Sequence, residues 1–424
     1  MKMKGILLLS CLTFVFAQDL PRKIGQFETS NPAFTDFYEN RQATRPQDRW
    51  NLLYSCFSGA PIPDYIRQVR GFGQYLGNVN NTVVQQLSDE VEWPREPGSI
   101  PFEVFGHEAI HAPDGFLVPG KDEGTVNIID MRNNPPTTHQ LIPRDWWFYH
   151  RVTWMDMNGD GRIDIVTARA RREPNTGITI SELIWLEHPA SANPLLEEWD
   201  VNVLSEDVAD TMHRALNLTV DGRTYQVIFT IGYFSGRVSV FWTTNPNGYW
   251  TNVNEVRSRT IDSDIQRGFS VELEDVNNDG KLDIIVPDNS VTNGSVLVYE
   301  IPNDFRVDPF PKHNLQSGFV PLRDDDDAGS PGTVNSFYPR ANATGSKPYL
   351  MVSGDDDGKA YILTPRSQDP RDWSYDIHLL FESDEELFSP IVGKLSAVDA
   401  DGDGFTEIIL PEYWADIMHV YSYA

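Results

Sequence analysis

Three stretches of the chain place oxygen-bearing side chains at alternate positions of a nine-residue loop. The stretches are residues 156–164, 275–283 and 399–407. Side chains at positions 1, 3, 5 and 9, with the backbone carbonyl at position 7, match the oxygen ligands with which an EF-hand loop begins to wrap Ca²⁺. Because every donor in the three stretches is an oxygen, the pattern favours calcium over zinc or copper.

The spacing defines the predicted ligands of each loop. They are Asp156, Asn158, Asp160, the carbonyl of Arg162 and Asp164; Asp275, Asn277, Asp279, the carbonyl of Lys281 and Asp283; and Asp399, Asp401, Asp403, the carbonyl of Phe405 and Glu407. A glycine at position 6 of each loop permits the sharp turn. An EF-hand would need Glu at position 12, and Thr167, Val286 and Leu410 stand there instead. Glu407 is longer than the aspartate of the other loops, so we expect it to bind through water or to shift its loop.

Asp-Gly pairs also form hairpin turns without any metal. One copy would leave that interpretation open, but three copies with the full spacing, each followed by a β-rich run, favour calcium. Two other acidic runs, residues 324–327 and 355–357, lack the alternate spacing. We expect the first to be a solvated loop and the second to be a hairpin turn.

A strand that follows a glycine-rich or polar turn recurs along the chain. Its copies begin at residues 124, 182, 236, 294, 358 and 416, so they lie 54 to 64 residues apart. Each copy alternates apolar and polar residues, as a strand in a sheet with two unlike faces does. Further β-rich runs around each copy make four strands per repeat, and no stretch has a long helical period. This repeat predicts an all-β chain folded as a β-propeller.

The repeat length predicts seven four-stranded blades, with six blades and an N-terminal extension as the alternative. The expected divisions are a signal peptide at 1–17, a lead-in at 18–48 and the propeller at 49–424. Residues 50–105 would form a degenerate first blade. The last unit, residues 390–424, has room for three strands, so we expect residues 24–29 to supply its fourth strand. Such a closure would join the first and last blades and remove an exposed sheet edge.

The loop motif resembles the FG-GAP/VCBS repeats of integrin-α-like β-propellers. The resemblance rests on the three loops, and the blade period extends it over most of residues 110–424. It implies that each loop joins the two innermost strands of a blade and holds calcium through the five ligands named above. It says little about activity, because this fold hosts many functions.

The first residues are typical of a secretory signal. Lys2 and Lys4 precede an apolar run at residues 6–16, which is too short to span a bilayer. We therefore expect a secreted, extracellular protein without a transmembrane segment. Four sequence motifs for N-glycosylation predict glycans at Asn80, Asn217, Asn293 and Asn342. Once Cys11 leaves with the signal, Cys56 is either a buried thiol or a bridge between chains.

Histidine and arginine recur where the innermost strands of the predicted blades begin. The residues are His111, His150, Arg151, His213, Arg214 and Arg267. Innermost strands all run the same way along the axis, so we expect their starts to gather at one mouth of the channel, opposite the calcium loops. A cationic ring there would bind an anionic or sugar-acid ligand, or a transition metal through imidazole. The alternative is that these side chains cap strand ends and form hydrogen bonds between blades.

Residues 107–111 read His-Glu-Ala-Ile-His, which is the spacing of a zinc-peptidase helix. Gly106 and Pro113 bracket the motif and the surrounding pattern is β, so we expect a short connector between blades instead of a zinc site.

The formal net charge of −28 repels nucleic acid and anionic membranes and attracts cations. With the loops and the signal, it predicts a secreted calcium-binding β-propeller whose role is extracellular recognition of a protein, glycan or matrix surface. The alternative function is a sugar-directed lyase, dehydratase or hydrolase, in which a His or Tyr base acts beside the arginines of the channel mouth.

Overall fold

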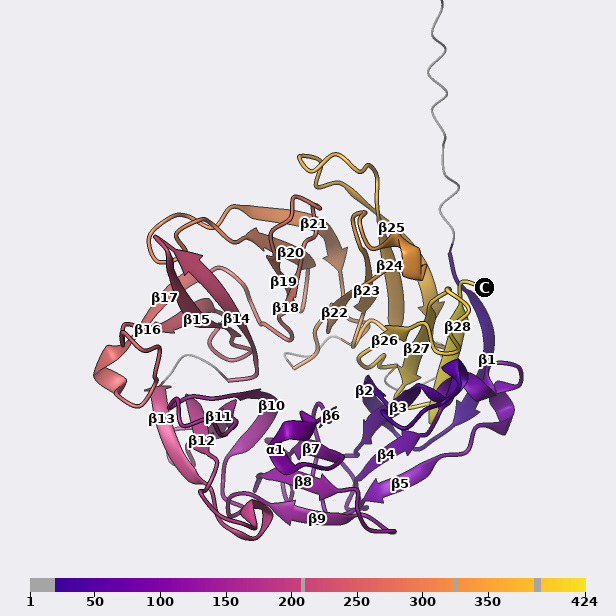
Figure 1. Cartoon of the computed structure of the whole chain (residues 1–424). Helices are drawn as coiled ribbons and strands as arrows, with labels where there is room; N and C mark the ends of the chain where they lie inside the picture. The colour runs from indigo at the N-terminus through magenta and orange to yellow at the C-terminus, as the bar shows by residue number, and fades with distance from the viewer. Residues whose placement is uncertain (1–19, 207–209, 324–326, 385–389) are drawn as a thin grey trace, which may run out of the picture.

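Seven four-stranded antiparallel sheets form a ring in the computed structural model of the chain, as Figure 1 shows. The structure describes residues 20–206, 210–323, 327–384 and 390–424. The expected signal peptide and all but the last residue of the acidic run 324–327 lie outside the described residues. The architecture is a seven-bladed β-propeller, which confirms the predicted fold and the count of seven over six.

The blades are numbered here in chain order, and the strands of each are given from the axis outward. Blade 1 contains β2 (Pro32–Glu39), β3 (Trp50–Cys56), β4 (Tyr65–Val69) and β5 (Gln85–Ser88). Blade 2 contains β6 (Gly98–Ser99), β7 (Ala109–Pro113), β8 (Val126–Asp130) and β9 (Thr137–Gln140). Blade 3 contains β10 (Phe148–Met155), β11 (Asp164–Arg172), β12 (Thr179–Glu187) and β13 (Asp200–Glu206).

The second half of the ring follows the same order. Blade 4 contains β14 (Met212–Val220), β15 (Arg223–Ile231), β16 (Val238–Thr243) and β17 (Val256–Asp262). Blade 5 contains β18 (Glu272–Glu274), β19 (Asp283–Asp288), β20 (Gly294–Glu300) and β21 (Lys312–Phe319). Blade 6 contains β22 (Val334–Phe337), β23 (Tyr349–Ser353), β24 (Lys359–Pro365) and β25 (Tyr375–Glu382). Blade 7 contains β26 (Ser396–Val398), β27 (Glu407–Glu412), β28 (Ile417–Ser422) and β1 (Arg22–Glu28).

Helical structure in the described part of the chain is confined to single turns between strands. They are α1 (Phe102–Phe105) and the 3₁₀ turns η1 (Pro46–Asp48), η2 (Phe72–Tyr75), η3 (Val79–Asn81), η4 (Pro194–Leu196), η5 (Val253–Glu255) and η6 (Ala341–Ala343). A helix able to cross a membrane is not found among the described residues.

The N-terminal strand closes the ring. β1 pairs antiparallel with β28, from Arg22 opposite Ser422 to Glu28 opposite Ile417, and so becomes the outermost strand of blade 7. Figure 1 shows β1 beside β28 at this blade. The prediction that residues 24–29 supply the missing strand is confirmed.

The recurring strand of the sequence is the third strand of a blade in six of the seven sheets. Its copies are β8, β12, β16, β20, β24 and β28. The apolar side chains of neighbouring sheets meet between blades: Phe229 and Val240 of blade 4 share one core with Ile284 of blade 5. Seven cores of the described residues lie between neighbouring blades in this way, so one blade alone cannot bury its apolar faces.

The first blade differs from the prediction. It begins at Pro32, inside the segment expected to be a lead-in, and its last strand ends at Ser88 instead of reaching residue 105. Phe34, Thr35 and Tyr38 of β2 are buried. β2 lacks the long apolar run by which strands are recognised in a sequence, and it forms a strand because it packs at the axis of the ring.

Two further sequence predictions concern the state of one cysteine and the exposure of four asparagines. Cys56 is buried in the core between blades 7 and 1, and burial raises the pKa of its thiol to about 12. The structure therefore favours the buried thiol over a bridge between chains. The asparagines of the four glycosylation motifs are exposed, as glycan acceptors must be.

The closing strand leads to a prediction about stability. Phe27 of β1 is buried between Leu52 of blade 1 and Met418 of blade 7. Phe27→Ala should lower the free energy of unfolding by about 3–5 kcal/mol, because it leaves a cavity at the closure. Urea denaturation followed by tryptophan fluorescence measures the change. Phe102→Ala is the control: Phe102 is 42% exposed, so its loss should cost about 0.5 kcal/mol or less. Equal unfolding midpoints for the two variants would contradict the role given to β1.

Candidate functional site: the carboxylate loops and the central channel

The three carboxylate loops lie at one end of the innermost strands. Residues 156–164 join β10 to β11, residues 275–283 join β18 to β19, and residues 399–407 join β26 to β27. All three therefore connect the first and second strands of a blade, on the same face of the ring.

The loops share one pattern of hydrogen bonds. In the third loop, Asp399 accepts from the N–H of Gly404 at 3.1 Å, and Asp401 accepts from the N–H of Asp403 at 3.1 Å. The ninth residue, Glu407, accepts from the N–H of Ala400 at 2.9 Å. The equivalent bonds recur in the other two loops. Each loop is thus folded around its own acidic side chains, so that the oxygens at alternate positions turn inward.

The loops differ in how closely their carboxylates approach. Among the described residues, one group of three metal-ligating side chains has ligand atoms within 4.8 Å of one another, and it consists of Asp399, Asp401 and Asp403. Glu407 is not part of that group. In the first loop the guanidinium of Arg162 forms an ion pair with Asp160. The third loop therefore presents the most concentrated set of oxygen donors.

The carboxyl groups at position 9 are the buried members of the loops. Burial, reinforced by the neighbouring loop carboxylates, raises the pKa of Asp164 to about 6, of Asp283 to about 8 and of Glu407 to about 7. A buried acid that accepts two hydrogen bonds, as Asp164 does from Met157 and His188, fixes the loop to the following strand.

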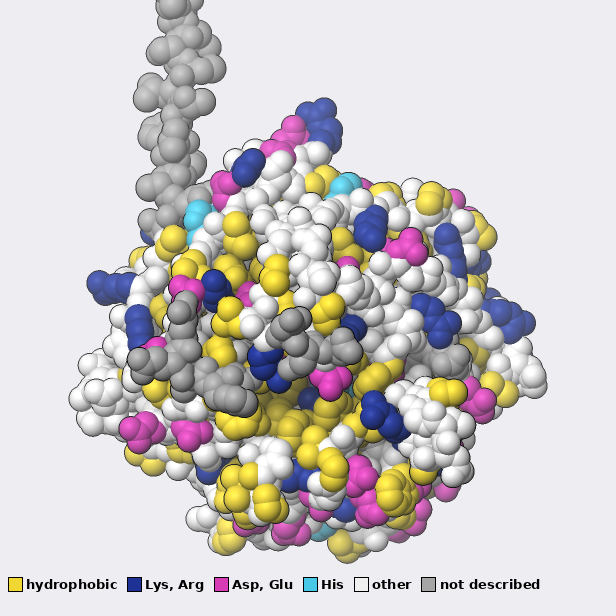
Figure 2. All heavy atoms as spheres, turned by 180° about the vertical axis from the view of Figure 1, so that it is seen from behind, with side chains coloured by type: hydrophobic (Ala, Val, Ile, Leu, Met, Phe, Trp, Pro, Cys, Tyr) yellow, Lys and Arg dark blue, Asp and Glu magenta, His cyan; other side chains and the backbone are white. Residues whose placement is uncertain are grey.

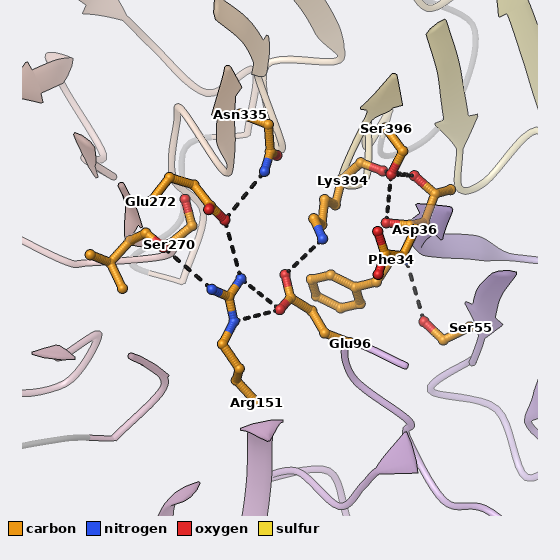
Figure 3. A network of polar contacts seen from close by, with 12 residues as sticks. Phe34, Asp36, Ser55, Glu96, Arg151, Ser270, Glu272, Asn335, Lys394 and Ser396 are labelled. Carbon is orange, nitrogen blue, oxygen red and sulfur yellow. Dashed lines mark hydrogen bonds and ion pairs between the residues drawn. The ribbon is translucent and has the colours of Figure 1, made fainter. Parts of the chain in front are cut away.

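The central channel contains a network of ionised side chains, and Figure 3 shows four of them: Glu96, Arg151, Glu272 and Lys394. We call Glu96, Arg151, Arg214, Glu272 and Lys394 the channel ion network. Arg151 donates to Glu96 at 2.6 Å and lies 3.4 Å from Glu272. Arg214 donates to both oxygens of Glu272 at 2.6 Å, and Lys394 lies 3.3 Å from Glu96. The network links blades 3, 4, 5 and 7 to the segment before blade 2.

The two glutamates of the network are ionised. Burial alone would raise the pKa of Glu96, but Arg151, Lys394 and Arg214 outweigh burial and hold it well below its ordinary value. Burial opposes ionisation of Glu272 too, and Arg214 and Arg151 again hold its pKa below the ordinary value. The predicted ring of unpaired cations is therefore wrong. Three cations of the channel are paired with two carboxylates, Glu96 and Glu272, which the sequence did not predict.

His111 comes from a different strand than predicted. It lies in β7, the second strand of blade 2, and does not start an innermost strand. The innermost strand β6 is two residues long, and Gly98 in it has no side chain, so the imidazole of His111 lies directly over it. Nδ1 of His111 is 3.2 Å from the indole nitrogen of Trp154. Burial lowers the pKa of His111 to about 3, so its ring is neutral.

His150 and His213 lie near the starts of β10 and β14, as predicted, and both are buried. Burial lowers the pKa of His213 to about 3 and that of His150 well below its usual range. The ring of His150 contacts Phe34 and Phe269 edge-on. The one metal-like group among the described side chains contains no histidine. Nδ1 of His150 and both ring nitrogens of His213 are buried without a hydrogen-bond partner among the described residues. These two rings therefore support neither the imidazole metal site nor the alternative of hydrogen bonds between blades.

Arg267 lies outside the channel ion network. It precedes β18, whose first residue is Glu272, and it donates to the hydroxyl of Tyr233 and to the carbonyl of Ala328. Its carbonyl accepts from the N–H of Asn289 at 2.9 Å, and the adjacent Gly268 forms an isolated bridge with Asp288 of β19. Arg267 therefore lies where the innermost strand of blade 5 begins to pair, ahead of the regular strand β18. Its hydrogen bonds join the connections beside blades 4, 5 and 6.

The His-Glu-Ala-Ile-His motif is not helical. His107 follows the left-handed Gly106 that ends α1, whereas His111 lies within β7. His107 is 3.2 Å from Asp130. The two imidazoles therefore have separate partners. The predicted connector between blades is wrong in place, because residues 107–108 end the connection from β6 to β7 within blade 2 and residues 109–111 belong to β7.

The channel ion network leads to a second prediction. Glu96→Gln leaves Lys394 unpaired and weakens the hold on Arg151, so it should lower the free energy of unfolding by about 3–5 kcal/mol at neutral pH. Because the folded pKa of Glu96 is depressed, this contribution is present above the unfolded pKa of about 4.3 and is lost as pH falls through the folded value. Urea titrations at pH 7 and at lower pH measure both effects.

Glu382→Gln is the matched control for Glu96→Gln. Glu382 pairs with Lys359 at 2.9 Å on the surface, so its loss should change the free energy of unfolding by about 1 kcal/mol or less. A difference between wild type and Glu96→Gln that stays constant as the pH falls would contradict the assignment.

No protein-family model and no curated protein matches the chain. Several solved structures are similar to it. The Dos1 propeller is 10% identical, with 95% of this chain and 96% of that chain covered and a TM-score of 0.48. The V. cholerae biofilm matrix protein Bap1 is 12% identical, with 95% and 89% covered and a TM-score of 0.37. Prolyl oligopeptidase B from Galerina marginata is 10% identical, with 90% of this chain and 47% of that chain covered and a TM-score of 0.36.

Proposed function

We propose that this protein is a secreted, calcium-binding β-propeller that acts in extracellular recognition of a protein, glycan or matrix surface. The observation that carries the proposal is the shared geometry of the three carboxylate loops. Each connects the two innermost strands of its blade, and in each the side chain at position 1 accepts a hydrogen bond from the N–H of the glycine at position 6. The predicted FG-GAP/VCBS relationship is part of this proposal and accounts for the position of the loops.

Charge supports a cation in these loops. Asp399, Asp401 and Asp403 bring carboxylate oxygens within 4.8 Å of one another. Three like charges at such a distance repel, and a hard divalent cation converts the repulsion into coordination. The donor set contains only oxygen, which suits calcium better than zinc or copper. Calcium in these loops would fix the end of each innermost strand and leave the other face of the ring free.

The channel, the glycosylation motifs and the net charge support the proposal of recognition over that of catalysis. The cations of the channel are paired with Glu96 and Glu272, and the histidines beside them are neutral, so the His/Arg machinery of the alternative enzyme is occupied in holding the fold. The four asparagines of the glycosylation motifs are exposed. The net charge of −28 favours cation-dependent contacts with partners.

The first test of this proposal is stability in calcium and in chelator. A bound ion stabilises the folded state by about 2.7 kcal/mol per site at a calcium concentration one hundred times the dissociation constant. We therefore expect the melting temperature of the purified protein to rise by several degrees in millimolar calcium relative to EGTA. Magnesium at the same concentration is the control for ionic strength. Identical melting curves in calcium and EGTA would exclude a structural calcium role.

The second test assigns the ions to the loops. Asp403→Asn removes one charge from the most concentrated loop, so bound calcium should fall by about one equivalent. Elemental analysis after dialysis measures the stoichiometry. Asp369→Asn is the control, because Asp369 is an exposed acid paired with Arg371 on an outer turn. Equal calcium content in both variants would show that the third loop holds no ion.

Binding to glycan and matrix-protein arrays in calcium then tests recognition, and an absence of binding on both would count against it.

A further inference from the structure

The face of the ring opposite the carboxylate loops has an apolar hollow at its centre. Figure 2 looks onto this face and shows hydrophobic side chains at the floor of the hollow, with charged side chains around it. The cavity has a volume of about 260 Å³. Its walls include Phe34, Phe57, Trp93, Phe269, Ile391 and Tyr413, which come from different blades and connections. We call this cavity the aromatic hollow.

Two cations line the aromatic hollow: Lys394, which pairs with Glu96, and Arg95, which is 5% exposed. Its guanidinium lies 3.9 Å from the ring centre of Phe116, and about 6 Å from the rings of Trp93, Phe57 and Phe34. Burial lowers its pKa to about 9, so the group still carries its charge at neutral pH. Aromatic faces attract a cation but do not replace the hydrogen bonds it had in water.

Arg95 has no polar partner for its side chain in the described part of the chain. Its Nε–H is buried and donates to no acceptor there, and no described carboxylate oxygen lies within 4.0 Å of the guanidinium. Arg151, the other buried arginine among the described residues, differs because it pairs with Glu96. A buried charge without a partner costs several kcal/mol. Such a cost is typical of a group that meets its partner in a ligand.

Two further polar atoms of the aromatic hollow lack partners within the described chain. They are the indole nitrogen of Trp93 and the hydroxyl of Thr333. Trp93 is also held at a φ of 49°, in the left-handed region that a bulky residue rarely adopts. Its backbone N–H donates to Asp64, which holds the residue there. Trp93 and Arg95 therefore present two unpaired donors from one short segment to the same cavity.

The acid in the wall of the aromatic hollow does not neutralise Arg95. Asp355 lines the cavity, but its carboxylate is farther than 4.0 Å from the guanidinium. Burial, followed by repulsion from Asp356 and Asp357, raises the pKa of Asp355 well above its usual range. The hydroxyl of Tyr413 is already used, because it donates to the carbonyl of Phe57 at 2.7 Å. Arg95 and the indole N–H of Trp93 are thus donors without acceptors among the described residues, and an anion would supply acceptors.

We propose that the aromatic hollow binds a small organic monocarboxylate. The carboxylate would accept from the guanidinium of Arg95, and the apolar or aromatic part of the ligand would pack among Phe34, Phe57 and Trp93. The volume of about 260 Å³ is slightly below the range of drug-sized pockets and sets the ligand at roughly ten to fifteen non-hydrogen atoms. This binding site lies on the face away from the loops and does not depend on calcium being bound.

A carboxylate fits the aromatic hollow better than a neutral apolar ligand of the same shape. The neutral ligand would displace water from the guanidinium and give no hydrogen bond in return, which adds to the desolvation cost. A carboxylate accepts two parallel hydrogen bonds from one arginine, and such charge-assisted bonds are about twice as strong as neutral ones. Affinity should therefore depend on the charge of the ligand as well as on its apolar surface.

The test compares acids with their uncharged amides by isothermal titration calorimetry. The probes are 3-phenylpropionate and 3-phenylpropionamide, followed by straight-chain acids of four to ten carbons with their amides, all with the full-length protein in calcium. We expect at least one acid to bind about 10- to 100-fold more tightly than its own amide, which is the weight of a buried charge-assisted pair. The proposal is wrong if no acid of the panel binds more tightly than its amide.

Variants then locate the site. Arg95→Met should weaken binding of the acid about 10- to 100-fold and leave the amide unchanged. Arg171→Met is the matched control, because Arg171 also lies over a tryptophan, Trp147, but outside the hollow. Gly59→Glu is a second variant that does not depend on replacing a buried group: a side chain at Gly59 meets nothing within 4 Å, and Gly59 lines the hollow. Its added carboxylate should weaken the acid more than the amide. Unchanged acid affinity in Gly59→Glu and in folded Arg95→Met would overturn the proposal.

Discussion

The pairing of β1 with β28 is the interaction on which the other features of the molecule depend. It joins residues 22–28 to residues 417–422, so the two ends of the chain meet in one sheet. Without β1, blade 7 would have three strands, and β28 would be an open edge beside the first blade. The core that Phe27 shares with Leu52 and Met418 joins blade 7 to blade 1 and so closes the ring. Each other core lies between blades, so each relies on a ring that is closed.

Closing the ring brings seven innermost strands to one axis, and this crowding shapes the channel. β6 has two residues, and β18 and β26 have three each. Where β6 is short, a side chain of the second strand reaches the axis, as His111 does over Gly98. Charges from five positions of the ring meet in the channel ion network, where carboxylates and cations neutralise one another. A buried network of this kind gains little net stability, but any misplaced blade would leave a charge unpaired.

The sequence predicts the parts of the structure that are local. The third strands recur because each must pack on both faces, and the carboxylate loops recur because one spacing turns four oxygen-bearing side chains inward. The closing strand follows from counting strands in the last unit. What the sequence does not reveal is the meeting of residues from different repeats. Glu96 and Glu272 are 176 positions apart, and nothing in either neighbourhood marks them as partners of Arg151.

Arg95 could not be predicted for the same reason. The predicted cations stand at the starts of apolar strands, whereas Arg95 lies in an irregular segment between Trp93 and Glu96. Its surroundings are aromatic because Phe34, Phe57 and Phe116 arrive from three other segments. An arginine without a partner is also invisible in a sequence, since partners are assigned only after the fold is known. That Arg95 has no polar partner among the described residues can therefore be seen only in the structure.

The excess of negative charge and a buried cation are compatible because the two act over different ranges. Exposed charges are screened within about 8 Å in physiological salt, whereas a charge inside an apolar cavity is screened much less. The net charge of −28 therefore slows the approach of an anion but does not cancel the attraction of Arg95 once water is displaced. Because the negative potential of the protein slows association of an anion, affinity for an acid must come from slow dissociation. The aromatic walls around the guanidinium favour this outcome, because they exclude the water that would compete for its hydrogen bonds.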